Sequence, residues 1–234
     1  MKIAMSVLYK NHSYYYAFEE TEIIRVSSAL DADIRILGLQ IPFIVSYRAT
    51  QICVLEEKRS KNYQVSLDSF LVLDDASRLT IFCTKEIPPQ KSLSLPDECD
   101  IRFGRLEVAS NGIRNQVVIN LPYISSSHCR LIRSGNKTTL SDTNSKNGIY
   151  VNGKEVDNVC LADGDVISVF TTRIVYRNNC LYFENIGNRL RILKIQHLSS
   201  KNTVPKNARI PSHSQSSSVP QNDMSDLLDE LAGE

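Results

Sequence analysis

Hydrophobic and polar residues alternate in short runs along the first part of the chain, without the longer periodicity of an amphipathic helix. The apolar runs are rich in Val, Ile, Tyr and Phe, and polar residues separate each run from the next. They occupy residues 4–9, 23–26, 34–37, 43–47, 51–55, 70–73 and 79–83. Short strands at near-regular spacing are typical of a β-sandwich or barrel. We therefore predict that residues 1–88 fold as an all-β domain.

A second β-rich region follows in residues 97–195, after a stretch rich in proline and serine that predicts a linker. Its turn signals are stronger than those of the first region. A pair of adjacent residues that are each asparagine or glycine favours a tight hairpin between two β-type runs, because both residue types tolerate a positive φ angle. Such pairs are Gly135-Asn136, Asn152-Gly153 and Asn178-Asn179. The pattern predicts two all-β domains in sequence.

Residues 196–234 differ in composition from the two β-rich regions: no aromatic residue follows Phe183, and polar residues dominate. Such a segment buries too little apolar surface to offset the entropy of ordering, so we predict a disordered tail. Within it, Thr203 is a candidate phosphorylation site that would bind in cis or in a neighbouring copy. Residues 224–232 place apolar side chains at helical spacing among acidic ones. That segment is either a frayed acidic end or a short helix that docks into a partner.

Charge and cysteine content narrow the classes of function. The chain has 27 Lys and Arg against 26 Asp and Glu, a net charge of +1, which argues against nucleic acid as a partner. No run approaches the ~20 apolar residues of a membrane span, and residues 3–9 read as a strand rather than a signal peptide. We expect a cytoplasmic protein that is recruited, at most, to a membrane complex. The 6 cysteines form no C-x-x-C pair, which predicts reduced thiols, no metal site and no cofactor.

Four short motifs follow one another in the second region, each where a β-type run meets a loop. They are Gly104-Arg105, Ser125-x-x-His128, Asn147-Gly148 and Gly164-Asp165. Their order resembles the forkhead-associated (FHA) domain over roughly residues 97–185. The resemblance implies an eleven-stranded β-sandwich whose loops at one end bind phosphothreonine peptides.

The residue types also suit that ligand chemically. A phosphothreonine has up to two negative charges and three acceptor oxygens. Arg105 offers bidentate donors and Ser125 a hydroxyl, so the resemblance assigns both to the phosphate. The amide of Asn147 can donate to and accept from the peptide backbone at once. The resemblance further implies that His128 supports the loops, and that Gly104 and Gly148 allow tight turns.

Two positions depart from the family pattern. Ser126 stands where members often have Arg, Lys or Asn, so we expect weaker phosphate binding there. Lys146 replaces a small Ser or Thr before Asn147. It either restores a positive charge or crowds the pocket that distinguishes threonine from serine.

Residues 1–88 contain a fainter copy of the same pattern. Residues 23–27 parallel the strand that leads to Arg105, residues 31–36 parallel 115–120, and residues 66–73 parallel 161–168. The copy lacks the glycine before the arginine and the Ser-x-x-His and Asn-Gly motifs. Either the similarity is chance, or the chain is a tandem whose first sandwich is a degenerate FHA-like domain without a phosphate site; we predict the tandem.

A tandem of this kind resembles the N-terminal region of the FtsK/SpoIIIE-type ATPases of type VII secretion. No G-x-x-x-x-G-K-[ST] phosphate loop occurs here, which leaves a standalone relative, a truncated copy or a fragment. Without a nucleophile and base pattern, we predict no enzyme and no catalytic residues. The leading hypothesis is an adaptor for a Thr-phosphorylated protein, such as a kinase substrate or a secretion component. The alternative is a phospho-independent scaffold of such a secretion machinery.

Overall fold

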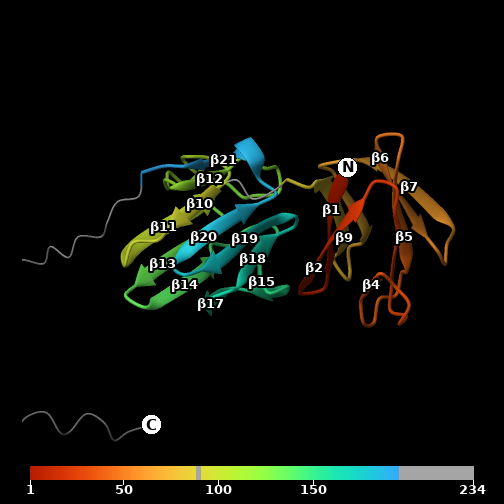
Figure 1. Cartoon of the computed structure of the whole chain (residues 1–234), viewed down its shortest axis with the longest axis horizontal. Coiled ribbons are helices and arrows are strands. Elements are labelled where there is room, and N and C mark those ends of the chain that lie inside the picture. Colours follow the sequence, from red (N-terminus) through yellow and green to blue (C-terminus); the bar gives the residue numbers. More distant parts are fainter. Residues whose placement is uncertain (88–90, 195–234) are drawn as a thin grey trace, which may run out of the picture. The chain divides into compact units, whose positions relative to one another are not determined.

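The computed structural model describes residues 1–87 and 91–194, whose strands are labelled in Figure 1. The described residues form β-strands β1–β21 and one short 3-10 turn, η1, at Gly187–Arg189. The prediction of an all-β chain is therefore confirmed. We call residues 1–87 the first β unit and residues 91–194 the second β unit.

The first β unit is a sandwich of two layers, antiparallel except for the parallel pair β3 and β4. One layer has the order β2-β1-β9-β8, and the other has the order β4-β3-β5-β6-β7. The strands are β1 Lys2–Tyr9, β2 His12–Glu19, β3 Ile23–Ser27, β4 Ile34–Arg35, β5 Phe43–Arg48, β6 Gln51–Glu56, β7 Lys61–Ser66, β8 Phe70–Asp74 and β9 Leu79–Lys85. Residues 4–9, for which the sequence predicts a strand, lie in the buried β1.

The second β unit is a larger sandwich, with twelve strands where the resemblance implied eleven. Its layers have the orders β10-β20-β19-β18-β15-β16 and β17-β14-β13-β11-β12-β21. The strands are β10 Lys91–Ser94, β11 Glu98–Gly104, β12 Val117–Ile119, β13 Cys129–Ser134, β14 Lys137–Asp142, β15 Ile149–Val151, β16 Lys154–Val156, β17 Asn158–Cys160, β18 Val166–Val169, β19 Thr172–Arg177, β20 Cys180–Glu184 and β21 Leu190–Ile192.

The three predicted hairpin turns of the second β unit are confirmed. Gly135 lies between β13 and β14 with a φ of 57°, and Asn152 and Gly153 join β15 to β16 with φ angles of 51° and 80°. Asn178 and Asn179 join β19 to β20 with φ angles of 50° and 55°. At the second and third turns, two successive positive φ angles match the right-handed twist of the flanking strands; at the first turn only Gly135 has a positive φ.

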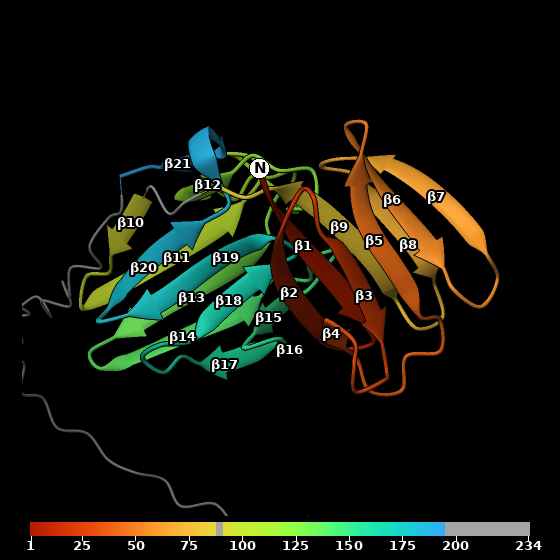
Figure 2. The same cartoon turned by 45° about the vertical axis from the view of Figure 1, so that its right-hand side comes forward.

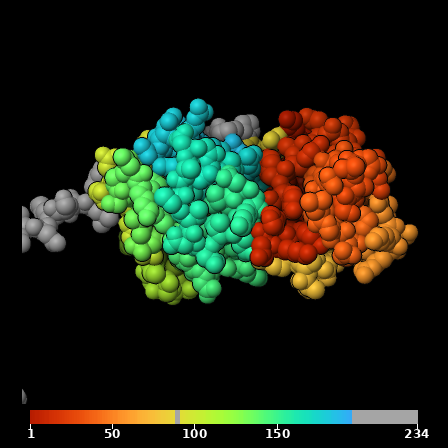
Figure 3. All heavy atoms as spheres, turned by 90° about the horizontal axis from the view of Figure 1, so that it is seen from below, coloured from red at the N-terminus to blue at the C-terminus, as the bar shows by residue number. Residues whose placement is uncertain are grey.

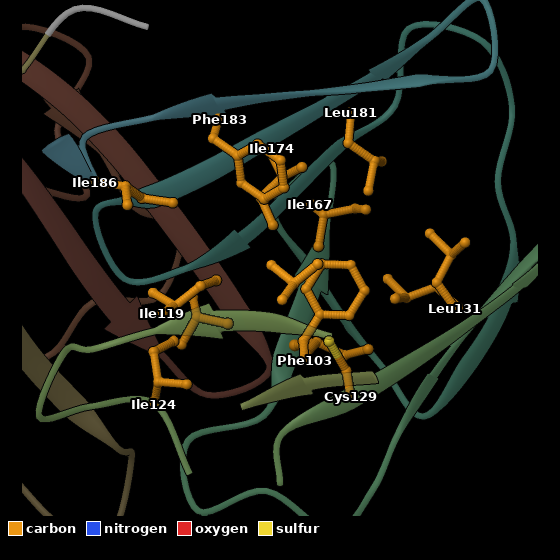
Figure 4. Close-up of a cluster of buried hydrophobic side chains, with 14 of the residues drawn as sticks. Phe103, Ile119, Ile124, Cys129, Leu131, Ile167, Ile174, Leu181, Phe183 and Ile186 are labelled. Atoms are coloured by element: carbon orange, nitrogen blue, oxygen red, sulfur yellow. The ribbon is translucent and has the colours of Figure 1, made fainter. Parts of the chain in front are cut away.

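Each β unit has its own hydrophobic core, filled from both layers. In the second β unit, Phe103 and Cys129 of one layer face Ile167 and Ile174 of the other (Figure 4). Phe82 of the first β unit belongs to this same core. Cys83, Cys99, Cys129 and Cys180 are buried, Cys53 is partly exposed and Cys160 is exposed.

One sheet runs through both β units, because β2 of the first pairs with β16 of the second (Figure 2). The backbone N–H of Ser13 donates to the carbonyl of Gly153 at 2.8 Å, and that of Glu155 donates to the carbonyl of Asn11 at 2.9 Å. Atoms of the two units are in direct contact in the space-filling view (Figure 3). The sequence patterns did not predict this shared sheet.

The linker prediction is wrong for Lys91–Ser94, which forms β10 and pairs with β20. Leu93 packs against the core of the second β unit. The serines on either side of Leu93 made this segment resemble a linker in the sequence. The division into domains at residues 88 and 97 remains a prediction. The predicted disordered tail, its amphipathic segment and Thr203 lie outside the described residues.

The five strands β3–β7 repeat the connections of β11, β12, β13, β14 and β17 in the second β unit. In both sheets, the first of these strands pairs in parallel with the second and antiparallel with the third. Val26 pairs with Ile34 as Phe103 pairs with Val117, so Ser27 and then Ser28 correspond to Gly104 and Arg105. The first β unit thus lacks the arginine at the equivalent position.

Candidate functional site: the loops at one end of the second β unit

The predicted site residues lie on three neighbouring loops, which follow β11, precede β13 and join β14 to β15. Ser125 connects all three. Its backbone carbonyl accepts a hydrogen bond from the Arg105 N–H at 2.8 Å, and its Oγ accepts one from the Lys146 N–H at 3.0 Å. The Ser125 hydroxyl proton remains available to a ligand.

Arg105 is half-buried directly after β11. Two other arginines of this unit, Arg130 and Arg133, are neutralised: they lie 2.6 and 2.8 Å from the carboxylates of Asp100 and Asp97. No carboxylate among residues 1–87 and 91–194 forms an ion pair with Arg105. A half-buried guanidinium without a counter-charge is suited to bind an anion.

The two residues that depart from the family pattern also border this loop cluster. The Ser126 hydroxyl is half-buried and lies 3.5 Å from the hydroxyl of Ser110. The Lys146 side chain is exposed, and only its backbone is fixed by Ser125. A flexible ammonium group at this place can approach an anion without a fixed geometry.

The Asn147 side chain is held by the loop before β13. Its Nδ2 donates to the backbone carbonyl of Tyr123 at 2.8 Å. One N–H and the carbonyl Oδ1 of this amide make no hydrogen bond to the part of the chain that the structure describes. Asn147 therefore keeps one donor and one acceptor for a peptide backbone.

His128 is buried beneath these loops and joins them. Its side-chain Nδ1 accepts a hydrogen bond from the Ser125 backbone N–H at 3.1 Å. Its backbone N–H donates to the carbonyl of Phe103, and its backbone carbonyl accepts from the N–H of Thr143. Burial lowers the pKa of His128, while the Asp142 charge and the Gly148 backbone act in the opposite direction. The imidazole is thus neutral at pH 7, with its proton on Nε2.

Gly104 is required by close packing. A Cβ at this position would collide with the Ser126 carbonyl oxygen and the side-chain amide of Asn115. That amide is buried and donates to the carbonyls of Leu106 and Ser126, at 2.7 and 2.6 Å. Asn115 thereby joins the loops of Arg105 and Ser126, and sequence reasoning missed it because a polar residue between Arg114 and Gln116 resembles a solvent-exposed one.

Gly148 ends the third loop with a φ of 71°, and a Cβ there would collide with the carboxylate of Glu155. The same loop is closed by Asp142, which accepts hydrogen bonds from the N–H and the hydroxyl of Ser145 at 2.7 and 2.8 Å. The Ser145 Oγ in turn accepts from the Gly148 N–H at 3.1 Å. Lys146 and Asn147 are therefore presented by a loop with fixed ends.

Among residues 1–87 and 91–194, no group of three or more His, Cys, Asp or Glu side chains is arranged to hold a metal ion. None of the described residues belongs to a helix with the length and apolar character needed to cross a membrane.

Comparisons with known proteins agree on one family. An FHA domain family model matches residues 101–169. The N-terminal FHA domain of EssC, a component of the bacterial type VII secretion apparatus, matches with 13% identity and a TM-score of 0.63. That match covers 82% of this chain and 97% of the other, and at this identity it shows the fold alone. A comparison with curated proteins gave no match.

Two further solved structures match shorter parts of the chain. The FHA-2 domain of an ABC transporter from Mycobacterium tuberculosis has 31% identity over 42% of this chain and 83% of its own, with a TM-score of 0.31. A domain from a study of phosphothreonine-dependent FHA domain interactions has 23% identity over 53% of this chain and 90% of its own, with a TM-score of 0.28. With a family model matched at the predicted loops and a fold match that extends across both β units, this chain belongs to the FHA-domain proteins and resembles the N-terminal FHA region of EssC.

Proposed function

We propose that this chain is a non-enzymatic adaptor that binds a phosphothreonine-containing protein at the loops of its second β unit. Arg105 and Ser125 would bind the phosphate, assisted by Ser126 and Lys146, and Asn147 would hold the peptide backbone. Residues 97–195 would be the binding domain and residues 1–88 a sandwich without a phosphate site. The proposed setting is the cytoplasm, with recruitment to a membrane complex.

One observation carries this proposal: Arg105 has no carboxylate partner among the described residues, although it is half-buried and its backbone is bonded to Ser125. At the equivalent end of the first β unit, Ser28 stands at the position of Arg105. Two arginines lie near this end: Arg25 is neutralised by Glu57 and Asp31 at 2.9 and 3.3 Å, and the exposed Arg35 donates to the carbonyl of Ser28 at 3.5 Å. A guanidinium without a counter-charge, on a residue whose backbone is bonded to Ser125, together with the Ser125 hydroxyl and the Asn147 amide, matches the charge and donor needs of a phosphothreonine peptide.

A peptide titration tests the proposal. The full chain would be titrated calorimetrically with a phosphothreonine peptide library and with unphosphorylated copies of the same peptides. We expect binding of phosphorylated peptides only, and a loss of about tenfold or more in affinity for Arg105→Ala. The matched control is Arg177→Ala, which removes an exposed arginine from the hairpin between β19 and β20. Equal binding of both peptide sets would refute the proposal.

A phospho-independent scaffold is the second candidate. It is favoured by exposed apolar side chains in the first β unit, where Leu30 is 83% and Leu37 is 71% exposed. Exposed apolar residues of this kind can mark a protein interaction surface. This candidate predicts that Arg105→Ala retains the partner, whereas Leu30→Ser with Leu37→Ser loses it. A pulldown with both variants separates the two functions.

A further inference from the structure

An arginine of the first β unit reaches the hairpin beside the peptide-binding loop of the second. Arg78 lies in the turn between β8 and β9, and its Nη1 donates to both carboxylate oxygens of Glu155 at 3.0 and 2.8 Å. Its Nη2 donates to the hydroxyl of the fully buried Tyr150 at 3.4 Å. The N–H of Glu155 also donates to Asn11. The first β unit thus holds Glu155 by its backbone and by its carboxylate.

Glu155 in turn supports the loop that carries Lys146 and Asn147. Its carboxylate occupies the space next to Gly148 that any larger side chain would need. Gly148 directly follows Asn147 in the chain. A carboxylate held in place by Arg78 therefore limits where this part of the loop can lie.

A second contact leads from the first β unit to the same asparagine. The rings of Phe70 and Phe82 pack edge-on against the ring of Tyr123, with centroid distances of 6.0 and 4.7 Å. The backbone carbonyl of Tyr123 is the acceptor for the Asn147 amide. Phe170 completes this aromatic cluster. Both supports of Asn147 therefore rest on side chains of the first β unit.

We propose that the first β unit positions the peptide-binding loop of the second, and that Arg78 is the positioning residue that acts through Glu155. This inference rests on the proposed function. It assigns the first β unit a role in phosphopeptide affinity, although none of the residues proposed to bind the phosphate belongs to that unit. The competing view is that these contacts only hold the two units together.

A matched pair of variants separates these views in the full chain. Arg189 forms an ion pair with Asp68 across the same junction at 3.4 Å, and its side chain is 42% exposed, as is that of Arg78. Among the described residues, no hydrogen bond or ion pair joins Arg189 or Asp68 to residues 142–148. We expect Arg78→Ala to weaken binding of the tightest phosphothreonine peptide about threefold to tenfold. Arg189→Ala should change the affinity by less than twofold, although it also removes an ion pair across the junction.

A double-mutant cycle tests the route through Glu155. If Arg78 acts by holding that carboxylate, Arg78→Ala has no further effect on affinity in a Glu155→Ala background. If Arg78 acts only as a distant positive charge on the phosphate, its effect persists in that background, and the proposal is overturned. It is also overturned if Arg78→Ala and Arg189→Ala weaken binding equally.

Nuclear magnetic resonance separates a failure of this inference from a failure of the proposed function. In the absence of peptide, Arg78→Ala should shift the Gly148 amide and the Asn147 side-chain signals more than Arg189→Ala does. If no phosphopeptide binds to the wild type, the proposed function fails, but these shifts still report the positioning. Unchanged signals in Arg78→Ala would overturn the inference whatever the peptide result.

Discussion

The imidazole of His128 accepts a hydrogen bond from the backbone N–H of Ser125 through its Nδ1, at 3.1 Å. This bond exists only while Nδ1 is unprotonated. Since Ser125 also contacts Arg105 and Lys146, the protonation state of one buried histidine affects all three loops.

We expect the stability of the chain to fall as the pH drops below about 6.5, the usual pKa of an unfolded histidine. Burial lowers the pKa of His128 in the folded state. Between the two values the unfolded chain binds more protons than the native one, so the free energy of unfolding rises with pH and is constant above about pH 7. Urea unfolding at several pH values measures this slope.

The control for this prediction is His128→Asn, which cannot titrate. Its free energy of unfolding should vary less than that of the wild type between about pH 5 and 7. Carboxylates with lowered pKa values, such as Asp100 beside Arg130, act at lower pH and do not obscure this window. Identical slopes in the two proteins would contradict the assignment.

Asn115→Ala should destabilise the second β unit by about 2–4 kcal/mol, because the backbone carbonyls of two loops lose the buried amide that donates to them. These belong to Leu106 and Ser126, on either side of the candidate phosphate site. Peptide affinity should fall with stability, since both loops lose a common anchor. Asn111→Ala, in an exposed turn of the same loop, should cost less than about 1 kcal/mol in the same urea unfolding experiment.

Much of the fold could be predicted because most strands bury one face. Runs such as residues 43–47 and 51–55 have enough β-branched and aromatic residues to identify β5 and β6. Strand β2 was missed, since its tyrosines are half-buried on both faces and give no clear alternation. Strand β7 was missed for the opposite reason: it is a largely exposed edge strand with few apolar residues.

Only those site residues that belong to short local motifs could be predicted from the sequence. Gly104-Arg105 and Asn147-Gly148 lie at strand ends, where sequence spacing suffices. Asn115 acts through a fold that brings the residues after β11 against the loop before β13, which no local pattern encodes. The contact of Arg78 with Glu155 joins residues 77 positions apart, so it required the structure.

The cysteines should differ strongly in reactivity. Cys160 is exposed, whereas burial raises the pKa of the Cys83 and Cys129 thiols and removes them from solvent. In the native chain we expect an aromatic disulfide reagent to react with Cys160 first and with the buried thiols only after denaturation. Cys160→Ser should abolish the fast phase. A fast phase that remains in this variant would contradict the exposure of the thiols described above.

Gly148→Ala should destabilise the chain by more than the cost of its positive φ angle. Gly135 serves as the control: it has a φ of 57°, but a Cβ added to it would have no neighbouring atom within 4 Å, whereas a Cβ on Gly148 meets Glu155. We expect about 1 kcal/mol for Gly135→Ala and about 2–4 kcal/mol for Gly148→Ala, measured by urea unfolding.

The excess for Gly148→Ala depends on how firmly Glu155 is held. A flexible carboxylate would move away at little cost, but this one would have to leave Arg78. In an Arg78→Ala background, Glu155 is free to move, so the difference between the two glycine variants should shrink. A difference of the same size in both backgrounds would show that the strain at Gly148 lies in the backbone alone.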